Sequence, residues 1–256
     1  MFMTARTQNG NLYTNIHNNI ATIEFGHPAS NSFPKELLER LSSELLLVGS
    51  NDAVSVIILK SEGAKTFCAG ASFDELIAIS NLEEGKQFFC GFANVLNAMR
   101  TCGKLIIGRV QGKTVGGGVG LIAACDYVLA TENAAVKLSE FTIGIGPFVI
   151  EPAVRRKIGV AGVSELTLDA THWKSAYWAK EKGLFATVLE TQTALDSEVE
   201  ILSEKLASYH PEALAAMKKA MWEGTENWEN LLAERAAISG HLVLSEFTKI
   251  ALSKYK

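Results

Sequence analysis

The sequence predicts an α/β core followed by a C-terminal helical region. Two observations predict this class. Apolar runs of strand length alternate with helical patterns over about the first 150 residues, and helical patterns dominate after them. We expect residues 1–190 to form the α/β core and residues 191–256 the helical region.

The first predicted elements are a strand, a helix and a second strand. "NIATIEF" (19–25) alternates like a half-buried strand, and the turn "HPASNS" follows it. Pro34 then opens a helical pattern that closes at Gly49. "VSVIILK" (54–60) is almost continuously apolar, as a buried parallel strand is. The small residues of "SEGAKTFCAGAS" (61–72) predict a loop after it.

The next predicted elements surround a second glycine-containing loop. A helical pattern covers residues 83–100, and "KLIIGRV" (104–110) predicts a strand. "GGGVGLIAACD" (116–126) begins with glycines and predicts a helix from about Gly117 to Cys125. "YVLAT" and "AVKLSE" predict two short strands, and the pattern from about residue 150 onward is mainly helical.

Composition and charge exclude several classes of partner. The 256 residues are 48% apolar, which is enough for a sizeable core. There are 28 acidic and 24 basic residues with no basic stripe, so we expect no nucleic-acid partner. No apolar run approaches the roughly 20 residues of a membrane span. The polar start, "MFMTARTQNG", lacks the apolar segment of a signal peptide, so we expect no membrane association.

The cysteines and histidines predict no metal site. The four cysteines form no CxxC pair, and the five histidines have no spacing typical of a metal site or a catalytic triad. Four reduced thiols in a cytoplasmic protein are the expected state.

The four glycines of "GGGVG" (116–120) need a functional reason, because glycine inside a helix costs about 1 kcal/mol relative to alanine. A dinucleotide fingerprint is one interpretation, and Glu140 lies about where its acidic residue is expected. That interpretation requires glycine or alanine at Leu121, and the segment "QGKTV" separates the loop from the preceding predicted strand.

An oxyanion site is the second interpretation of the same loop. Backbone N–H groups at a helix N-terminus stabilise developing negative charge, and glycine lets a ligand approach them closely. "FCAGAS" (67–72) follows another predicted strand and supplies a second set of small residues. A carbonyl held between two backbone amides fits this pair of loops. Either loop alone would be interpreted as an ordinary tight turn.

Three motifs in order resemble the enoyl-CoA hydratase/isomerase (crotonase) superfamily. They are "KTFCAGASFDEL" (65–76), "VQGKTVGGGVGLIAACDYVLAT" (110–131) and "VKLSEFTIGIGP" (136–147). The resemblance continues through "WAKEKGLFATVLE" (178–190) and the helical end. It implies a spiral of ββα units, an acyl-CoA thioester as substrate and no separate cofactor. It also implies that residues 191–256 pack between subunits of a homotrimer or a dimer of trimers.

The resemblance also implies the site residues. The backbone N–H groups of Ala71 and Gly117 would hold the thioester oxygen, and Glu140 would be the catalytic acid or base. The residues implied to surround the substrate are Ala69, Ser72, Phe73, Gly116, Gly120, Pro147 and Phe148.

The sequence departs from the hydratase pattern at Gly120. Hydratases that it resembles carry a glutamate there, so this chain keeps only Glu140 of their two acids. The Δ3,Δ2-enoyl-CoA isomerases also keep only the second acid, and "GIGPFVIEPAVRRKIG" (144–159) resembles their sequence at this point. A single base suffices to move a proton from C2 to C4, which favours an isomerase in fatty-acid or related metabolism.

Two alternatives stay open at this stage. A 2-enoyl-CoA hydratase would need a substitute acid, for which Glu62, Asp74, Glu75 and Glu151 are candidates. In an isomerase without a second carboxylate, hydration is expected to be slow, and Gly120→Glu is expected to raise it. A family member that binds acyl-CoA without catalysis is the other alternative. His172 and Trp173 fall where the family often has pocket residues.

Overall fold

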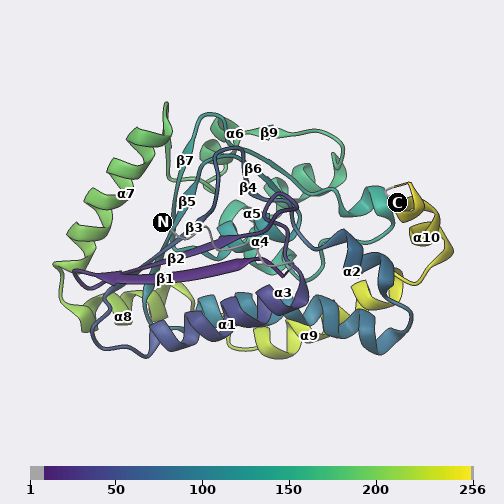
Figure 1. Cartoon of the computed structure of the whole chain (residues 1–256), viewed down its shortest axis with the longest axis horizontal. Helices are drawn as coiled ribbons and strands as arrows, with labels where there is room; N and C mark the ends of the chain where they lie inside the picture. Colours follow the sequence, from purple (N-terminus) through teal and green to yellow (C-terminus); the bar gives the residue numbers. More distant parts are fainter. Residues whose placement is uncertain (1–8, 255–256) are drawn as a thin grey trace, which may run out of the picture.

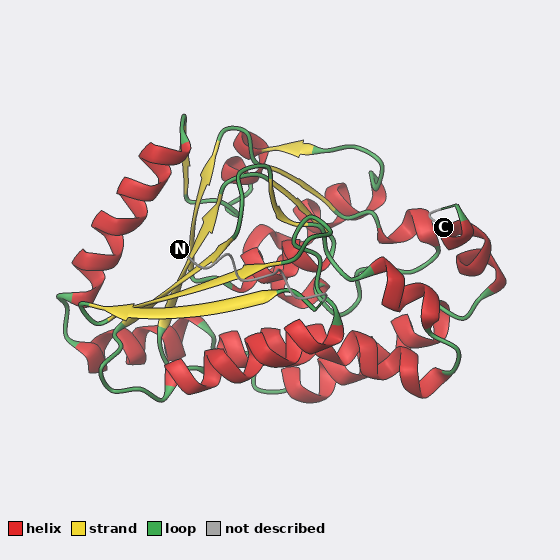
Figure 2. Ribbon diagram, in the orientation of Figure 1, coloured by secondary structure: helices red, strands yellow, loops and turns green. Residues whose placement is uncertain are grey.

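The computed structural model describes residues 9–254, and the polar start predicted to lack a signal peptide lies largely outside them. These residues form two sheets and a set of helices (Figure 1, Figure 2). In strand order, the larger sheet contains β1 (Asn11–His17), β2 (Ile20–Gly26), β3 (Val56–Ser61), β5 (Leu105–Val110), β7 (Tyr127–Thr131) and β10 (Thr187–Leu189). The smaller sheet contains β4 (Thr66–Cys68), β6 (Lys113–Val115), β8 (Ala135–Lys137) and β9 (Lys174–Ser175).

Helices follow the strand pairs and gather at the C-terminal end. The helices up to residue 143 are α1 (Lys35–Gly49), α2 (Phe73–Ala78), α3 (Leu82–Thr101), α4 (Gly117–Ala124) and the 3₁₀ turn η1 (Glu140–Ile143). The later helices are α5 (Glu151–Leu168), α6 (Ala176–Glu181), α7 (Gln192–Ala207), α8 (Pro211–Met221), α9 (Trp228–Leu242) and α10 (Glu246–Ser253). The order confirms the predicted ββα repetition.

Successive strand pairs divide between the two sheets in the same way. β3, β5 and β7 join the larger sheet, and the strand that follows each of them, β4, β6 or β8, joins the smaller one. β4, β6 and β8 are parallel neighbours, so their carboxyl ends lie at one edge of the smaller sheet. The three motifs singled out in the sequence follow these three ends, and the topology therefore brings them together.

The apolar run of β3 is buried on both faces, as its sequence predicts. Val56 and Ile58 face α7 in a small cluster that includes Leu195, whereas Ile57 and Leu59 face the main core. In Figure 1, α7 lies on one side of the larger sheet, and α1, α3 and α9 lie along another.

Several elements differ from those that the sequence predicts. β1 was not predicted, and the expected loop 61–72 contains β4. The segment 135–140 was predicted as a strand, but β8 ends at Lys137 and Glu140 begins η1. β4 and β8 have three residues each, too few for an alternating pattern to be visible.

Two glycines let α3 and α9 cross closely. A Cβ atom on Gly85 would lie 2.6 Å from the carbonyl oxygen of Gly240, and a Cβ on Gly240 would lie 2.5 Å from the backbone nitrogen of Lys86. Both contacts are with backbone, so a side chain at either position would push the helices apart.

We therefore expect Gly240→Ala to destabilise the fold although alanine is the better helix former. Overpacking should lower the free energy of unfolding by about 1–3 kcal/mol. The higher helix propensity of alanine offsets roughly 1 kcal/mol of this loss. Chemical denaturation measures this change, and Ser43→Ala at an exposed position of α1 serves as control. A Gly240→Ala protein more stable than wild type would contradict the close crossing.

Candidate active site

The carboxyl ends of β4, β6 and β8 place three segments around one cavity. Ala69–Ala71 follow β4, Gly116 and Gly117 follow β6, and Glu140 follows β8, and all of these residues line the cavity. The first two loops are in close proximity, since a Cβ on Gly70 would lie 3.6 Å from the backbone nitrogen of Gly117.

Gly116 has the backbone conformation and the free space that only glycine provides. Its φ is +53° and its ψ −124°, which side-chain-bearing residues rarely adopt. A Cβ there would lie 2.9 Å from Oε1 of Glu140. The glycine loop is therefore pressed against the carboxylate.

Gly117 is the first residue of α4, so its N–H has no partner within the helix. The Phe92 ring covers its Cα, because a Cβ on Gly117 would meet the ring at 2.2 Å. The N–H therefore lies at the positive end of the α4 dipole beside an aromatic wall of the cavity.

Ala71 lies in a short bridge with Phe33. The Phe33 N–H donates to the Gly70 carbonyl at 2.8 Å, and the Ser72 N–H donates to the Phe33 carbonyl at 2.9 Å. Because backbone groups alternate along an extended segment, the Ala71 N–H points away from Phe33. The Gly70 N–H also donates to the Cys68 Sγ at 3.3 Å, which fixes this loop.

The Glu140 carboxyl group is buried in a mostly apolar environment. Burial raises its pKa to about 7, although the backbone N–H of the residue lowers it by a smaller amount. Oε2 is buried and has no hydrogen-bond partner among the described residues. A carboxyl group with a pKa close to neutrality is suited to removing and returning a proton.

The rest of the lining is apolar apart from two serines. Besides the residues named above, it consists of Phe73, Leu76, Phe89, Val115, Ser139, Ile143, Ile145, Gly146, Pro147, Val149, Ile150 and Ser239. Glu140 is the sole acidic residue of this lining, which also contains no lysine, arginine or histidine.

Three of the residues predicted to contact substrate do not line the cavity. Ser72 caps α2, where its hydroxyl accepts a hydrogen bond from the Glu75 N–H. Phe148 packs against Gly146, and Gly120 lies buried within α4. The predictions for Ala69, Ala71, Phe73, Gly116, Gly117, Glu140 and Pro147 agree with the lining.

Ile150 occupies the space next to Gly120. A Cβ on Gly120 would lie 2.4 Å from Cγ2 and 2.7 Å from Cβ of Ile150, a residue of the cavity wall. A side chain at position 120 would therefore occupy the space that the Ile150 side chain fills. The expectation that Gly120→Glu by itself raises hydration is therefore corrected. A glutamate side chain at position 120 would overlap Ile150 and could not enter the cavity.

None of the four candidate substitute acids reaches the cavity lining. Asn11 donates to Glu62 at 3.2 Å, and Glu75 accepts from the Lys35 N–H at 2.7 Å. Asp74 lies in the first turn of α2, and Glu151 lies 4.0 Å from Arg155.

His172 and Trp173 also lie outside the lining. His172 contacts Asp169, and the Trp173 ring lies 5.0 Å from the Lys113 ammonium and 4.7 Å from that of Lys137.

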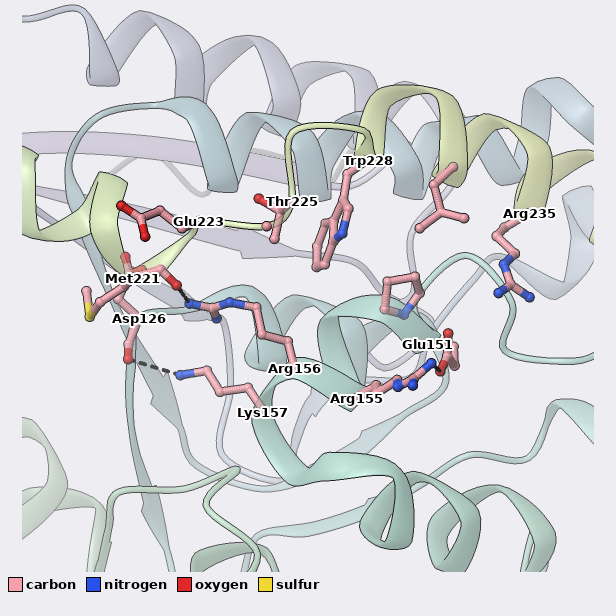
Figure 3. Close-up of a pocket in the computed structure, with 13 residues that line it drawn as sticks. Asp126, Glu151, Arg155, Arg156, Lys157, Met221, Glu223, Thr225, Trp228 and Arg235 are labelled. Atoms are coloured by element: carbon pink, nitrogen blue, oxygen red, sulfur yellow. Dashed lines mark hydrogen bonds and ion pairs between the residues drawn. The ribbon is translucent and has the colours of Figure 1, made fainter.

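A larger hollow of about 790 Å³ lies between α5, the segment after α8, and α9 (Figure 3). Its charges are largely satisfied within the fold: Lys157 donates to the Asp126 carbonyl at 3.0 Å, and Arg156 donates to the Met221 carbonyl and covers the Trp222 ring at 3.9 Å. These contacts attach the C-terminal helices to α5. We place the candidate site in the smaller cavity, since that is where a buried carboxyl group lies beside the N-terminus of α4.

The apolar wall and Ser239 were not predicted from the sequence. Phe89 and Phe92 lie at helical spacing in α3, which predicts a buried face but not a cavity. Nothing in the sequence around Ser239 distinguishes it from the other residues of an amphipathic helix.

Within residues 9–254, no cluster of histidine, cysteine, aspartate and glutamate side chains is suited to hold a metal ion. No helix in this range has the length and apolar character needed to cross a bilayer.

The model of the enoyl-CoA hydratase/isomerase family matches residues 15–248. The chain is 29% identical over 191 residues to the peroxisomal Delta(3,5)-Delta(2,4)-dienoyl-CoA isomerase of Arabidopsis thaliana, covering 69% of this chain and 67% of that protein. It is 26% identical over 239 residues to the short-chain-enoyl-CoA hydratase of Clostridium acetobutylicum, covering 92% and 90%.

A solved structure shares the fold. The crystal structure of enoyl-CoA hydratase from Bacillus halodurans superposes with a TM-score of 0.87 at 21% identity, covering 95% of this chain and 99% of that one. The predicted crotonase fold, with two sheets and C-terminal helices, is confirmed.

The raised pKa of Glu140 predicts a pH-dependent stability. The folded protein binds the Glu140 proton more tightly than the unfolded chain, so this contribution is present below about pH 4.5 and is lost as pH rises through about 7. We expect the stability of Glu140→Gln relative to wild type to increase between pH 5 and pH 8, as measured by chemical denaturation. A difference that stays constant with pH would show that the carboxyl group is not buried in this way.

Proposed function

This chain belongs to the enoyl-CoA hydratase/isomerase family, and we propose that within this family it is a Δ3,Δ2-enoyl-CoA isomerase. Family membership implies an acyl-CoA substrate, and enzymes of the family typically require no cofactor. The observation that carries the choice is the single buried carboxyl group in an otherwise uncharged cavity.

The proposed reaction moves one proton and one double bond. The Glu140 carboxylate removes a proton from C2 of a 3-enoyl thioester, and the electron pair moves through the conjugated system to the thioester oxygen. The N–H groups of Ala71 and Gly117 stabilise this dienolate oxygen. Protonated Glu140 then gives the proton to C4, which leaves the double bond between C2 and C3 and restores the carboxylate.

The apolar surroundings of Glu140 support isomerisation over hydration. Hydration needs a positioned water molecule and a group to orient it, and no second acid lines the cavity. Ile150 fills the space beside Gly120 where such an acid would project. The apolar wall also disfavours bulk water near the dienolate.

Two alternatives are retained. A 2-enoyl-CoA hydratase is favoured by relatives that are named enoyl-CoA hydratases, including the short-chain-enoyl-CoA hydratase of Clostridium acetobutylicum. A family member that binds acyl-CoA without turnover is the other. Paired assays on 3-hexenoyl-CoA and crotonyl-CoA, together with thioester binding, distinguish the three.

Residues 191–256 are proposed as the region that contacts neighbouring subunits in a homotrimer or a dimer of trimers. Exposed apolar side chains on α9 and α10 support this, with Ile238 41%, Phe247 65% and Ile250 56% exposed. The cytoplasmic location stays a prediction.

Glu140→Gln tests the proton transfer. We expect isomerisation of 3-hexenoyl-CoA to fall by about 10²–10⁴-fold, because an amide cannot accept and return the proton. Binding of a saturated thioester should persist. Isomerisation by the variant at the wild-type rate would contradict the role of Glu140.

Gly117→Pro and Gly117→Ala form a matched pair, in which both add a Cβ and only proline removes the N–H. Both are made with Phe92→Ala, which removes the ring that a Cβ would meet at 2.2 Å. We expect the proline protein to turn over about 10²–10³-fold more slowly than the alanine protein, as removal of one oxyanion donor does. Equal rates would contradict the oxyanion assignment.

Gly120→Glu, Ile150→Ala and the double variant test the shared volume. We expect Gly120→Glu to be destabilised with no gain of hydration, because its Cβ would overlap Ile150. The double variant should fold and hydrate crotonyl-CoA faster than wild type, and Ile150→Ala should not. A stable, hydrating single Gly120→Glu variant would refute the argument.

A further inference from the structure

Ser239 brings an unpaired hydroxyl into the cavity from α9. The residue is 1% exposed and lines the cavity, and its Oγ has no hydrogen-bond partner among the described residues. Ser203, equally buried in α7, donates instead to the Glu200 carbonyl at 3.0 Å. A helical serine can pair with its own backbone in this way, and a buried hydroxyl left unpaired is costly.

The crossing of α3 and α9 determines where this hydroxyl lies. Gly240 follows Ser239 and packs directly on Gly85, since neither glycine has space for a Cβ. The close approach holds α9 against the aromatic side of α3, from which Phe89 and Phe92 also line the cavity. Ser239 is therefore fixed in the wall by backbone packing.

We propose that Ser239 is a substrate-binding residue that recognises a neutral oxygen on the acyl chain, a hydroxyl or a keto group. This proposal rests on the proposed function, in which the cavity holds the acyl group. The side-chain polar groups of the lining are those of Ser139, Glu140 and Ser239.

The charges of the cavity select a neutral group. A carboxylate on the acyl chain would face Glu140 and would find no lysine, arginine or histidine in the lining. A hydroxyl or keto oxygen carries no charge and pairs with the Ser239 hydroxyl, which both donates and accepts. A wholly apolar chain would leave this hydroxyl unpaired.

Binding of saturated thioesters tests the proposal without requiring turnover. The probes are octanoyl-CoA and its analogues with one hydroxyl or keto group at each of carbons 4 to 8, measured by titration calorimetry on the full chain. We expect at least one analogue to bind wild type about 2- to 12-fold more tightly than octanoyl-CoA, the contribution of one neutral hydrogen bond. Ser239→Ala should abolish this preference while binding octanoyl-CoA at least as tightly.

Ser203→Ala is the matched control, because it removes an equally buried helical hydroxyl outside the cavity and should keep the preference. No preference in wild type, or a preference that survives in Ser239→Ala, would overturn the proposal, as would failure of all the thioesters to bind. A different role would follow if wild type hydrated crotonyl-CoA, Ser239→Ala did not, and no thioester were preferred in binding. In that case the Ser239 hydroxyl would hold a water molecule and not an oxygen of the acyl chain. The protein could also show the Ser239-dependent binding preference and no isomerase activity. That result would refute the proposed reaction and leave this inference intact.

Discussion

The placement of the Glu140 carboxyl group against the backbone of Gly116 is the constraint on which the site depends. The carboxyl group is buried, and a Cβ on the glycine would lie 2.9 Å from one of its oxygens. This packing raises the pKa of Glu140 to about 7, because burial disfavours the charged form. Gly116 also directly precedes α4, whose first N–H is a proposed oxyanion donor. One contact thus links the proposed base to the proposed anion site.

The two-sheet topology makes that contact possible. β6 ends at the glycine loop and β8 ends just before Glu140, and the two strands pair in parallel. The Gly116 N–H donates to the Lys137 carbonyl at 3.0 Å, which ties the two segments together at the strand ends. Other residues of the lining come from distant parts of the chain: Phe92 from α3, Ile150 from the turn before α5, and Ser239 from α9. The proposed reacting groups therefore come from one edge of the smaller sheet, whereas residues that surround them come from distant parts of the chain.

This division explains what the sequence could predict. The fold class, the order of the main elements and seven of the cavity residues follow from patterns within single segments, or from a resemblance that those segments carry. The short strand β4 and the 3₁₀ turn at Glu140 escaped prediction because pairing and tertiary contacts define them.

The competition between Gly120 and Ile150 joins positions 30 residues apart, so no local pattern reveals it. The unpaired hydroxyl of Ser239 likewise depends on how closely α9 approaches α3, which the sequence does not specify.

The central claim is that one buried carboxyl group carries a proton between two carbons of the same substrate. Turnover of a 3-enoyl-CoA labelled with deuterium at C2 tests this most directly, with the product analysed by NMR and mass spectrometry. The account predicts a 2-enoyl thioester with deuterium at C4, because the apolar cavity slows exchange of the Glu140 proton with solvent. A 3-hydroxyacyl product, or a 2-enoyl product whose C4 carries only solvent hydrogen, would contradict it.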